Sequence, residues 1–208
     1  MIKAVIFDVD GVLLDSFEAN LKFFSDLMNH FGHRSPTREE FPSLFHRPMK
    51  DIIKELSKLE NEQEIDKIWT AGKDGEVSYP HELLSGPENL EKIIKKLSKK
   101  YILGIVTSRT TENVFRFFPM TKIKQYFKIS VSYQDTKNHK PHPEPLLLSA
   151  EKLGVLPEEC VYVGDVENDV VAAKAAGMKA VIYSKNSVSS ADANVSLFSD
   201  LENAIDNL

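Results

Sequence analysis

The sequence predicts an α/β fold: a Rossmann-like parallel sheet with helices on both faces, plus an inserted all-helical domain. Three observations lead to this prediction. Short apolar runs recur along the chain, helical patterns lie between the later runs, and one long stretch near the start contains no convincing strand. Alternation of strands and helices is typical of parallel sheets that helices cover on both sides.

The strands of the sheet are predicted from apolar runs that are short enough to be buried strands. These runs lie at residues 2–7, 101–106, 127–131, 160–163 and 179–183. The pattern is weaker at 127–131 than in the other runs. Continuous apolar strands of this kind favour a parallel sheet that is buried on both faces.

Helical patterns separate the later runs. Apolar residues recur at helical spacing over 90–97, and further helices are predicted at 145–153 and at 169–176, which a glycine follows. The Ser- and Asn-rich stretch 184–194 is predicted to be a surface loop before a last short helix at 200–208.

The stretch between residues 16 and 82 contains helical patterns only. Its first apolar side chains repeat at intervals of four and three residues, as on one face of a helix: Phe17, Leu21, Phe24, Met28 and Phe31. We therefore predict that residues 16–82 form an inserted helical domain, and that residues 1–15 and 83–208 form the core domain that carries the sheet.

The composition restricts the class of partner. The chain has 208 residues, 42% of them hydrophobic and 27% charged, with a net charge of -5. A net negative charge gives no reason to expect nucleic acid or an anionic membrane as a partner. The first acidic residues come too early for a signal peptide, and no apolar run approaches about 18 residues, so we expect a cytoplasmic protein without a membrane span.

Polar side chains cluster directly after the predicted strands. Asp8 and Asp10 follow the first run, Thr107 follows the second, Lys140 lies in a Pro-rich loop before a helix, and Asp165 follows the run at 160–163. In open α/β sheets, ligands bind beyond the carboxyl ends of the strands, where the strand order reverses. We therefore expect these distant segments to meet in one pocket.

Charge in that pocket points to a metal ion. Two carboxylates about 4 Å apart repel each other by on the order of 4 kcal/mol at an effective dielectric constant near 20. Lys140 supplies one positive charge to the predicted cluster of Asp8, Asp10, Asp165 and Asp169, which is not enough. Mg²⁺ suits a site with few protein oxygen ligands, and it favours a phosphate-bearing substrate whose charge it neutralises.

Separate roles can be argued for the clustered residues. Asp8, at the tip of a strand, is placed to attack phosphorus and form an aspartyl-phosphate. Asp10 can act as general acid on the leaving group and then as general base on water. Lys140 would stabilise negative charge in the transition state.

Further residues are predicted to bind the phosphoryl oxygens. Gly11 lets the backbone approach closely, so that nearby N–H groups can donate to the phosphoryl group. Thr107, Ser108 and the N–H groups of a helix expected to begin after Arg109 supply additional donors.

Each residue taken alone has a simpler interpretation. Asp-x-Asp-Gly also occurs in calcium loops, but the twelfth position here is Ala19 instead of glutamate. Thr107 alone reads as a helix cap, and Lys140 alone as a surface lysine. Asp165 and Asp169 lie four apart on one face of a helix's first turn, and capping explains one of them but hardly both. The ordered set favours a catalytic site.

Four segments together resemble the motifs of the haloacid dehalogenase superfamily of Mg²⁺-dependent phosphohydrolases. The segments are DVDGVLLDS, ILGIVTS, KPHPEP and VGDVENDVVAAKAAGM, in this order along the chain. The resemblance implies that Asp8 is the nucleophile, Asp10 the acid and base, Thr107 and Lys140 phosphate-binding groups and Asp165 a metal ligand. It further implies a metal site completed by the Asp10 main-chain carbonyl, with Asp169 as a ligand or a supporting carboxylate.

The branch of the superfamily is indicated by an insert directly after the first motif. In having a helical insert at this position, the chain resembles the branch that contains phosphoglycolate phosphatase and β-phosphoglucomutase. Asp10 argues against a dehalogenase, and Gly164-Asp165 replaces the Glu-Asp usual in β-phosphoglucomutases. We therefore expect a phosphatase that acts on a small phosphorylated metabolite, similar to phosphoglycolate or a sugar phosphate. A phosphosugar mutase, a receiver-like phosphoprotein and a non-catalytic relative are the alternatives.

The insert is interpreted as a cap that closes over the site and excludes water. His46 and Arg47 are the candidates in the insert for contacting the leaving group of the substrate. The simpler interpretation is that both are surface loop residues.

Overall fold

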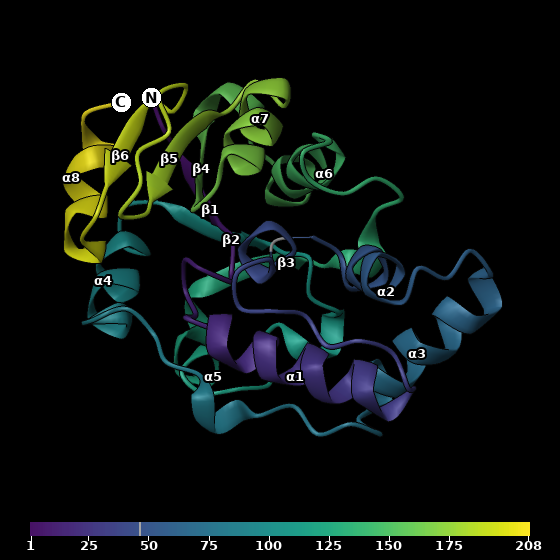
Figure 1. Cartoon of the computed structure of the whole chain (residues 1–208). Coiled ribbons are helices and arrows are strands. Elements are labelled where there is room, and N and C mark those ends of the chain that lie inside the picture. The colour runs from purple at the N-terminus through teal and green to yellow at the C-terminus, as the bar shows by residue number, and fades with distance from the viewer. Residues whose placement is uncertain (46) are drawn as a thin grey trace. The chain divides into compact units, whose positions relative to one another are not determined.

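The computed structural model describes residues 1–45 and 47–208 of the chain, which divide into two compact units (Figure 1). The sheet unit comprises Met1–Asp15 and Ser85–Leu208, and the helical unit comprises Ser16–Leu84. Asp15 and Ser85 exchange backbone hydrogen bonds of 2.8 and 3.2 Å, so the chain leaves and re-enters the sheet unit at adjacent positions.

The sheet unit contains six parallel strands in the order β3-β2-β1-β4-β5-β6. The strands are β1 (Ala4–Phe7), β2 (Ile102–Val106), β3 (Phe127–Val131), β4 (Cys160–Gly164), β5 (Lys179–Tyr183) and β6 (Ala193–Val195). The predicted runs correspond to the first five strands within two residues at each end. A parallel sheet with helices on both faces confirms the predicted fold class.

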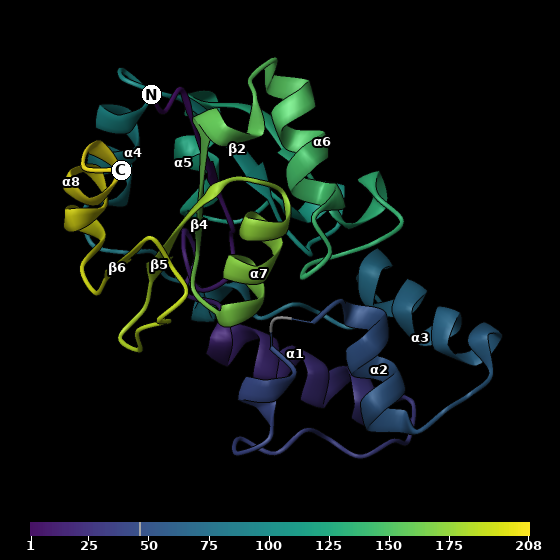
Figure 2. The same ribbon diagram turned by 90° about the horizontal axis from the view of Figure 1, so that it is seen from above.

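Helices of the sheet unit lie on both sides of the sheet (Figures 1 and 2). They are α4 (Leu90–Leu97), α5 (Met120–Ile123), α6 (Glu144–Leu153), α7 (Glu167–Ala175) and α8 (Leu201–Asp206). Helices α6 and α7 pack on one face, where alternate residues of the strands, such as Ala4 and Ile6 of β1, join one buried apolar cluster with Leu146 and Val170. Alternation follows from the two-residue period of a strand, which turns every second side chain to the same face.

The helical unit contains α1 (Phe17–His30), α2 (Met49–Ser57) and α3 (Glu62–Asp74). The predicted apolar face of α1 is confirmed, because Phe24 and Met28 are buried in the core of this unit and Phe17 packs against that core. Within the described residues of the unit no strand occurs, as the sequence predicts.

Two local predictions are wrong. The stretch 184–194 is not all loop, because β6 begins at Ala193 and pairs with β5. No α-helix begins after Arg109, where the structure has only a short 3₁₀ segment, Thr111–Asn113, before α5. Both segments lack a long apolar pattern, so tertiary contacts decide their conformation.

In the part of the chain that the structure describes, no helix is long and apolar enough to cross a membrane.

Candidate active site

The candidate site lies at the carboxyl ends of the central strands. β1 is paired with β2 on one side and with β4 on the other, and Phe7 is in register with both Ile105 and Val163. After β1 the chain adds β2 and β3 on one side of β1, and it then adds β4, β5 and β6 on the other side. The residues that follow β1, β2 and β4 therefore meet at the point where the strand order reverses, as the sequence predicts.

Asp8 lies at the end of β1 and is almost fully buried, with 6% of the residue exposed. One oxygen accepts a hydrogen bond of 2.7 Å from the backbone N–H of Val9, and the other accepts one of 2.7 Å from the Lys140 ammonium. The backbone N–H of Asp8 donates to the carbonyl of Val163, which continues the pairing of β1 with β4 past the end of the strand. The nucleophile predicted from the sequence is thus held on both sides.

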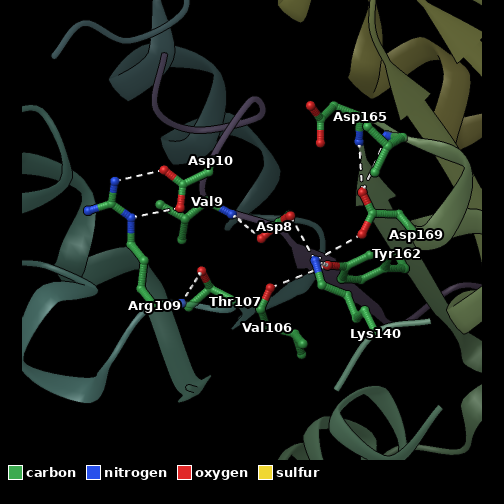
Figure 3. A network of polar contacts seen from close by, with 11 residues as sticks. Asp8, Val9, Asp10, Val106, Thr107, Arg109, Lys140, Tyr162, Asp165 and Asp169 are labelled. Atoms are coloured by element: carbon green, nitrogen blue, oxygen red, sulfur yellow. Dashed lines mark hydrogen bonds and ion pairs between the residues drawn. The ribbon is translucent and has the colours of Figure 1, made fainter. Parts of the chain in front are cut away.

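Lys140 connects three buried side chains (Figure 3). Its ammonium donates to Asp8 at 2.7 Å, to Asp169 at 2.8 Å and to the Tyr162 hydroxyl at 2.8 Å. The hydroxyl of Tyr162 donates in turn to the Val106 carbonyl at 3.3 Å. Tyr162 was not predicted as a site residue because it lies inside an apolar strand pattern, where a tyrosine reads as core.

Asp165 and Asp169 approach this cluster from β4 and α7. Asp165 lies in the loop before α7, not in its first turn as the spacing suggests, whereas Asp169 is inside that turn. One oxygen of Asp169 accepts from the backbone N–H groups of Asp165 (3.1 Å) and Val166 (3.4 Å), and the other accepts from Lys140. Asp169 therefore bridges the loop after β4 and the lysine.

The positions of the carboxylates require two glycines. A Cβ atom on Gly11 would overlap the Asp165 carboxylate, and one on Gly164 would overlap the side chain of Asp169. Gly11 also has a φ of +80°, a conformation that residues with a side chain rarely adopt. The glycines thus allow the acidic side chains to lie against the backbone of the neighbouring segment.

Burial and mutual repulsion perturb the acids. Burial raises the pKa of Asp8 to about 7, although Lys140 opposes this change, and the nearby Asp169 adds to it. Burial, followed by the charges of Asp169 and Asp8, raises the pKa of Asp165 to about 9. Burial disfavours the charged form of Lys140, but the two carboxylates that it contacts hold its pKa well above the usual value.

These acids could hold a metal ion. Asp8, Asp165 and Asp169 each offer an oxygen, and these three oxygens lie within 4.8 Å of one another. Burial, followed by repulsion from the neighbouring acids, disfavours the ionised forms of Asp8 and Asp165, and a bound cation would stabilise them. Carboxylate oxygens that need positive charge nearby in order to ionise suit a hard divalent cation.

Asp10 lies beside this cluster and is held by Arg109. The guanidinium donates from Nε to one Asp10 oxygen at 2.8 Å and from its terminal nitrogen to the other at 2.7 Å. Arg109 was not predicted as a site residue. The signal that could have identified it is charge, since the predicted pocket contained four acids and one lysine, and Arg109 is two residues beyond Thr107.

The other predicted residues fall into two groups. Thr107 is buried and its hydroxyl accepts from the Arg109 N–H at 3.2 Å, while Ser108 lines a small hollow together with Thr107 and Lys140. Arg47 belongs to the helical unit, and His46 lies outside the described residues. A contact of His46 or Arg47 with substrate stays a prediction.

Comparison with known proteins gives the family. The model of haloacid dehalogenase-like hydrolases matches residues 5–183. The chain is 31% identical over 180 residues to a putative pyrophosphatase PpaX of Clostridium perfringens, covering 86% of this chain and 82% of that protein. It is 29% identical over 184 residues to pyrophosphatase PpaX of Bacillus mycoides, with coverages of 88% and 84%.

A solved structure agrees with this match. A haloacid dehalogenase superfamily hydrolase of subfamily IA from Geobacter sulfurreducens is 29% identical with a TM-score of 0.71, covering 97% of this chain and 95% of that one. The chain belongs to the haloacid dehalogenase-like hydrolase family. It is a hydrolase of the phosphatase type, which confirms the predicted enzyme class and excludes the receiver-like alternative.

Proposed function

We propose that the chain is a Mg²⁺-dependent phosphatase that hydrolyses a small phosphorylated metabolite through an aspartyl-phosphate on Asp8. The observation that carries this proposal is the position of the buried Asp8 carboxylate. It lies at the reversal of the strand order, 2.7 Å from the Lys140 ammonium and in one cluster with Asp165 and Asp169.

The reaction has two steps. A carboxylate oxygen of Asp8 attacks the phosphorus, the bond from phosphorus to the leaving oxygen breaks, and Asp10 gives that oxygen a proton. Asp10 then takes a proton from a water molecule whose oxygen attacks the phosphorus, and the bond from phosphorus to Asp8 breaks. The products are the leaving alcohol or acid, inorganic phosphate and the original Asp8 carboxylate.

The phosphoryl group is held by donors around Asp8. Thr107, Ser108, Lys140 and the backbone N–H groups near Gly11 bind its oxygens, and Lys140 stabilises the charge that develops on them. The carboxylates of Asp8, Asp165 and Asp169 and the main-chain carbonyl of Asp10 would hold Mg²⁺, which would supply positive charge to the phosphoryl group.

The proposed substrates are small and phosphorylated. The sequence predicts compounds similar to phosphoglycolate or a sugar phosphate. Inorganic pyrophosphate is a further candidate, because the relatives from Clostridium perfringens and Bacillus mycoides are named pyrophosphatases. We further propose that the helical unit is a cap, that His46 and Arg47 reach the leaving group from it, and that the enzyme acts in the cytoplasm.

Hydrolysis is favoured over the phosphosugar mutase alternative by the space at Gly164. β-Phosphoglucomutases usually carry glutamate there, but any side chain at this position would overlap Asp169 where it lies here. A mutase would also show isomerisation that depends on a bisphosphate, with little net release of phosphate.

The test is release of phosphate from p-nitrophenyl phosphate with MgCl₂ present. Excess EDTA and the substitution Asp8→Asn should each abolish release, with a loss of at least about 10³-fold for the variant. Asp200→Asn, which changes an exposed aspartate of the sheet unit, is the matched control and should retain activity. Full activity of Asp8→Asn would refute the aspartyl-phosphate mechanism.

A further inference from the structure

The contact between Arg109 and Asp10 is a fork-to-fork pair with little exposure to solvent. The two N–H···O bonds measure 2.8 and 2.7 Å, and the side chains are 10% and 19% exposed, respectively. Planar guanidinium groups match carboxylates and phosphates through two parallel hydrogen bonds. The geometry at Arg109 is therefore that of a receptor for an oxyanion, which Asp10 now occupies.

The backbone of Arg109 is fixed in place from both sides. Its N–H donates to the Thr107 hydroxyl at 3.2 Å, and its carbonyl accepts from the N–H of Tyr133 at 2.9 Å. Because both groups are bonded within the sheet unit, the guanidinium reaches the strand ends from a preorganised loop. Preorganisation lowers the entropy lost on binding a ligand.

Arg109 and Lys140 lie on opposite sides of Asp8 (Figure 3). The ammonium of Lys140 donates to Asp8, Asp169 and Tyr162, so Lys140 lies on the side of the nucleophile and of the transferred phosphoryl group. In an in-line displacement the leaving oxygen lies opposite the nucleophile, on the side of the acid that protonates it. A second charged group on the leaving part of the substrate would thus lie on the side of Asp10 and Arg109.

We propose that Arg109 is a specificity-determining residue that binds a second anionic group, phosphate or carboxylate, on the leaving part of the substrate. The inference rests on the proposed function. Such a group replaces the Asp10 carboxylate on the guanidinium, and Asp10 is released towards the leaving oxygen. The favoured substrates are then phosphoric anhydrides of the pyrophosphate type or phosphate esters that carry a carboxylate, in preference to esters of neutral alcohols.

The test compares two substrates that differ in one group. 2-Phosphoglycolate carries a carboxylate where 2-hydroxyethyl phosphate carries a neutral hydroxymethyl group. Arg109→Gln should lower the ratio of kcat/KM for the first substrate over the second by about 10- to 100-fold, mainly through KM, because hydrogen bonds between charged groups are lost. Arg109→Lys, which keeps the charge without the fork, should lie between wild type and Arg109→Gln.

The matched control is Arg116→Gln, the same change at an exposed arginine of the sheet unit that lies over the Phe117 ring. It should leave the substrate ratio unchanged. Equal loss on both substrates in Arg109→Gln and Arg109→Lys would show a purely structural role and overturn the proposal.

A binding measurement separates this inference from the proposed function. Calorimetric titration of inorganic pyrophosphate with MgCl₂ into Asp8→Asn needs no turnover. Adding Arg109→Gln in that background should raise the Kd about 10- to 100-fold, whereas adding Arg116→Gln should not. An unchanged Kd overturns the role of Arg109 whether or not the enzyme hydrolyses phosphate esters. A raised Kd in a protein without Asp8-dependent hydrolysis supports the anion receptor and refutes the phosphatase mechanism.

Discussion

The two cations beside Asp8 sit in opposite electrostatic surroundings. Lys140 is surrounded by Asp8, Asp169 and Tyr162, and with Asp165 close by, this side has more acids than cations. Arg109 donates a matched pair of hydrogen bonds to the carboxylate of Asp10. We interpret the difference as a division of tasks, in which the Lys140 side would bind a metal ion and the transferred phosphoryl group, and Arg109 would bind an anionic group on the leaving part of the substrate.

The largest effect that we expect is the difference between removing Lys140 and removing Arg109. Lys140→Met leaves Asp8 and Asp169 buried without their shared cation, so kcat for p-nitrophenyl phosphate should fall at least about 10³-fold. The free energy of unfolding should also fall by about 3–5 kcal/mol, since a buried pair loses one partner. Arg109→Met should lower kcat by no more than about tenfold, because a hydrogen-bonded charge near the leaving group is removed and not the group that contacts Asp8. Equal losses in the two variants, measured by steady-state kinetics and urea unfolding, would contradict the division.

The surplus of acid on the Lys140 side predicts an unusual dependence of stability on pH. The pKa values of Asp8 and Asp165 are raised to about 7 and about 9 in the folded protein, whereas unfolded aspartates ionise near pH 4. Between these values the folded state binds more protons than the unfolded state, so stability falls as pH rises. In EDTA we expect a loss of several kcal/mol between about pH 5 and pH 8, and MgCl₂ should restore most of it at the higher pH. If the free energy of unfolding in EDTA, measured with urea, stays level or rises with pH, the pKa values of these acids are not raised in the folded protein.

Asp165→Asn should separate stability from function within the same cluster. Asp165 must take up a proton on folding at about pH 8, because its pKa in the folded protein is raised to about 9, whereas asparagine is neutral in both states. The Tm of the metal-free protein at this pH should therefore rise by about 3–6 °C, while phosphatase activity is lost with the metal ligand. Asp200→Asn, at an exposed position, serves as the control and should change neither quantity. A lower Tm for Asp165→Asn would contradict a destabilising effect of this buried acid.

Tyr162→Phe should have the smallest effect. The substitution removes the hydroxyl that accepts from Lys140 at 2.8 Å and contacts the Val106 carbonyl. We expect a loss of about 1 kcal/mol of stability and a fall in kcat of up to about tenfold, with KM little changed, because Lys140 loses one of three restraints. Tyr101→Phe, which removes an exposed hydroxyl bonded to Asp206, is the control. A change in KM alone would argue against a positioning role for Tyr162.

Much of the sheet could be predicted from the sequence, because buried parallel strands are continuous apolar runs. Phe127–Val131 and Lys179–Tyr183 have the predicted limits. The edge strand β6 was missed because its residues, Ala193–Val195, have no apolar run and are ordered by pairing with β5. The helix expected after Arg109 was wrong, since a strand–helix rhythm does not determine the conformation of the chain after each individual strand.

Local sequence patterns were sufficient to predict the succession of strands along the chain and the acids and the lysine that gather at their ends. Strand periodicity is local, and the carboxyl ends of parallel strands share one edge of the sheet. Only the folded sheet unit shows which side chains pair. Lys140 donates hydrogen bonds to Asp8, Asp169 and Tyr162. Arg109 donates to Asp10, from which it is separated by 99 positions in the sequence. A hydrogen bond depends on distances of a few tenths of an ångström between atoms, and packing of the whole sheet unit sets those distances.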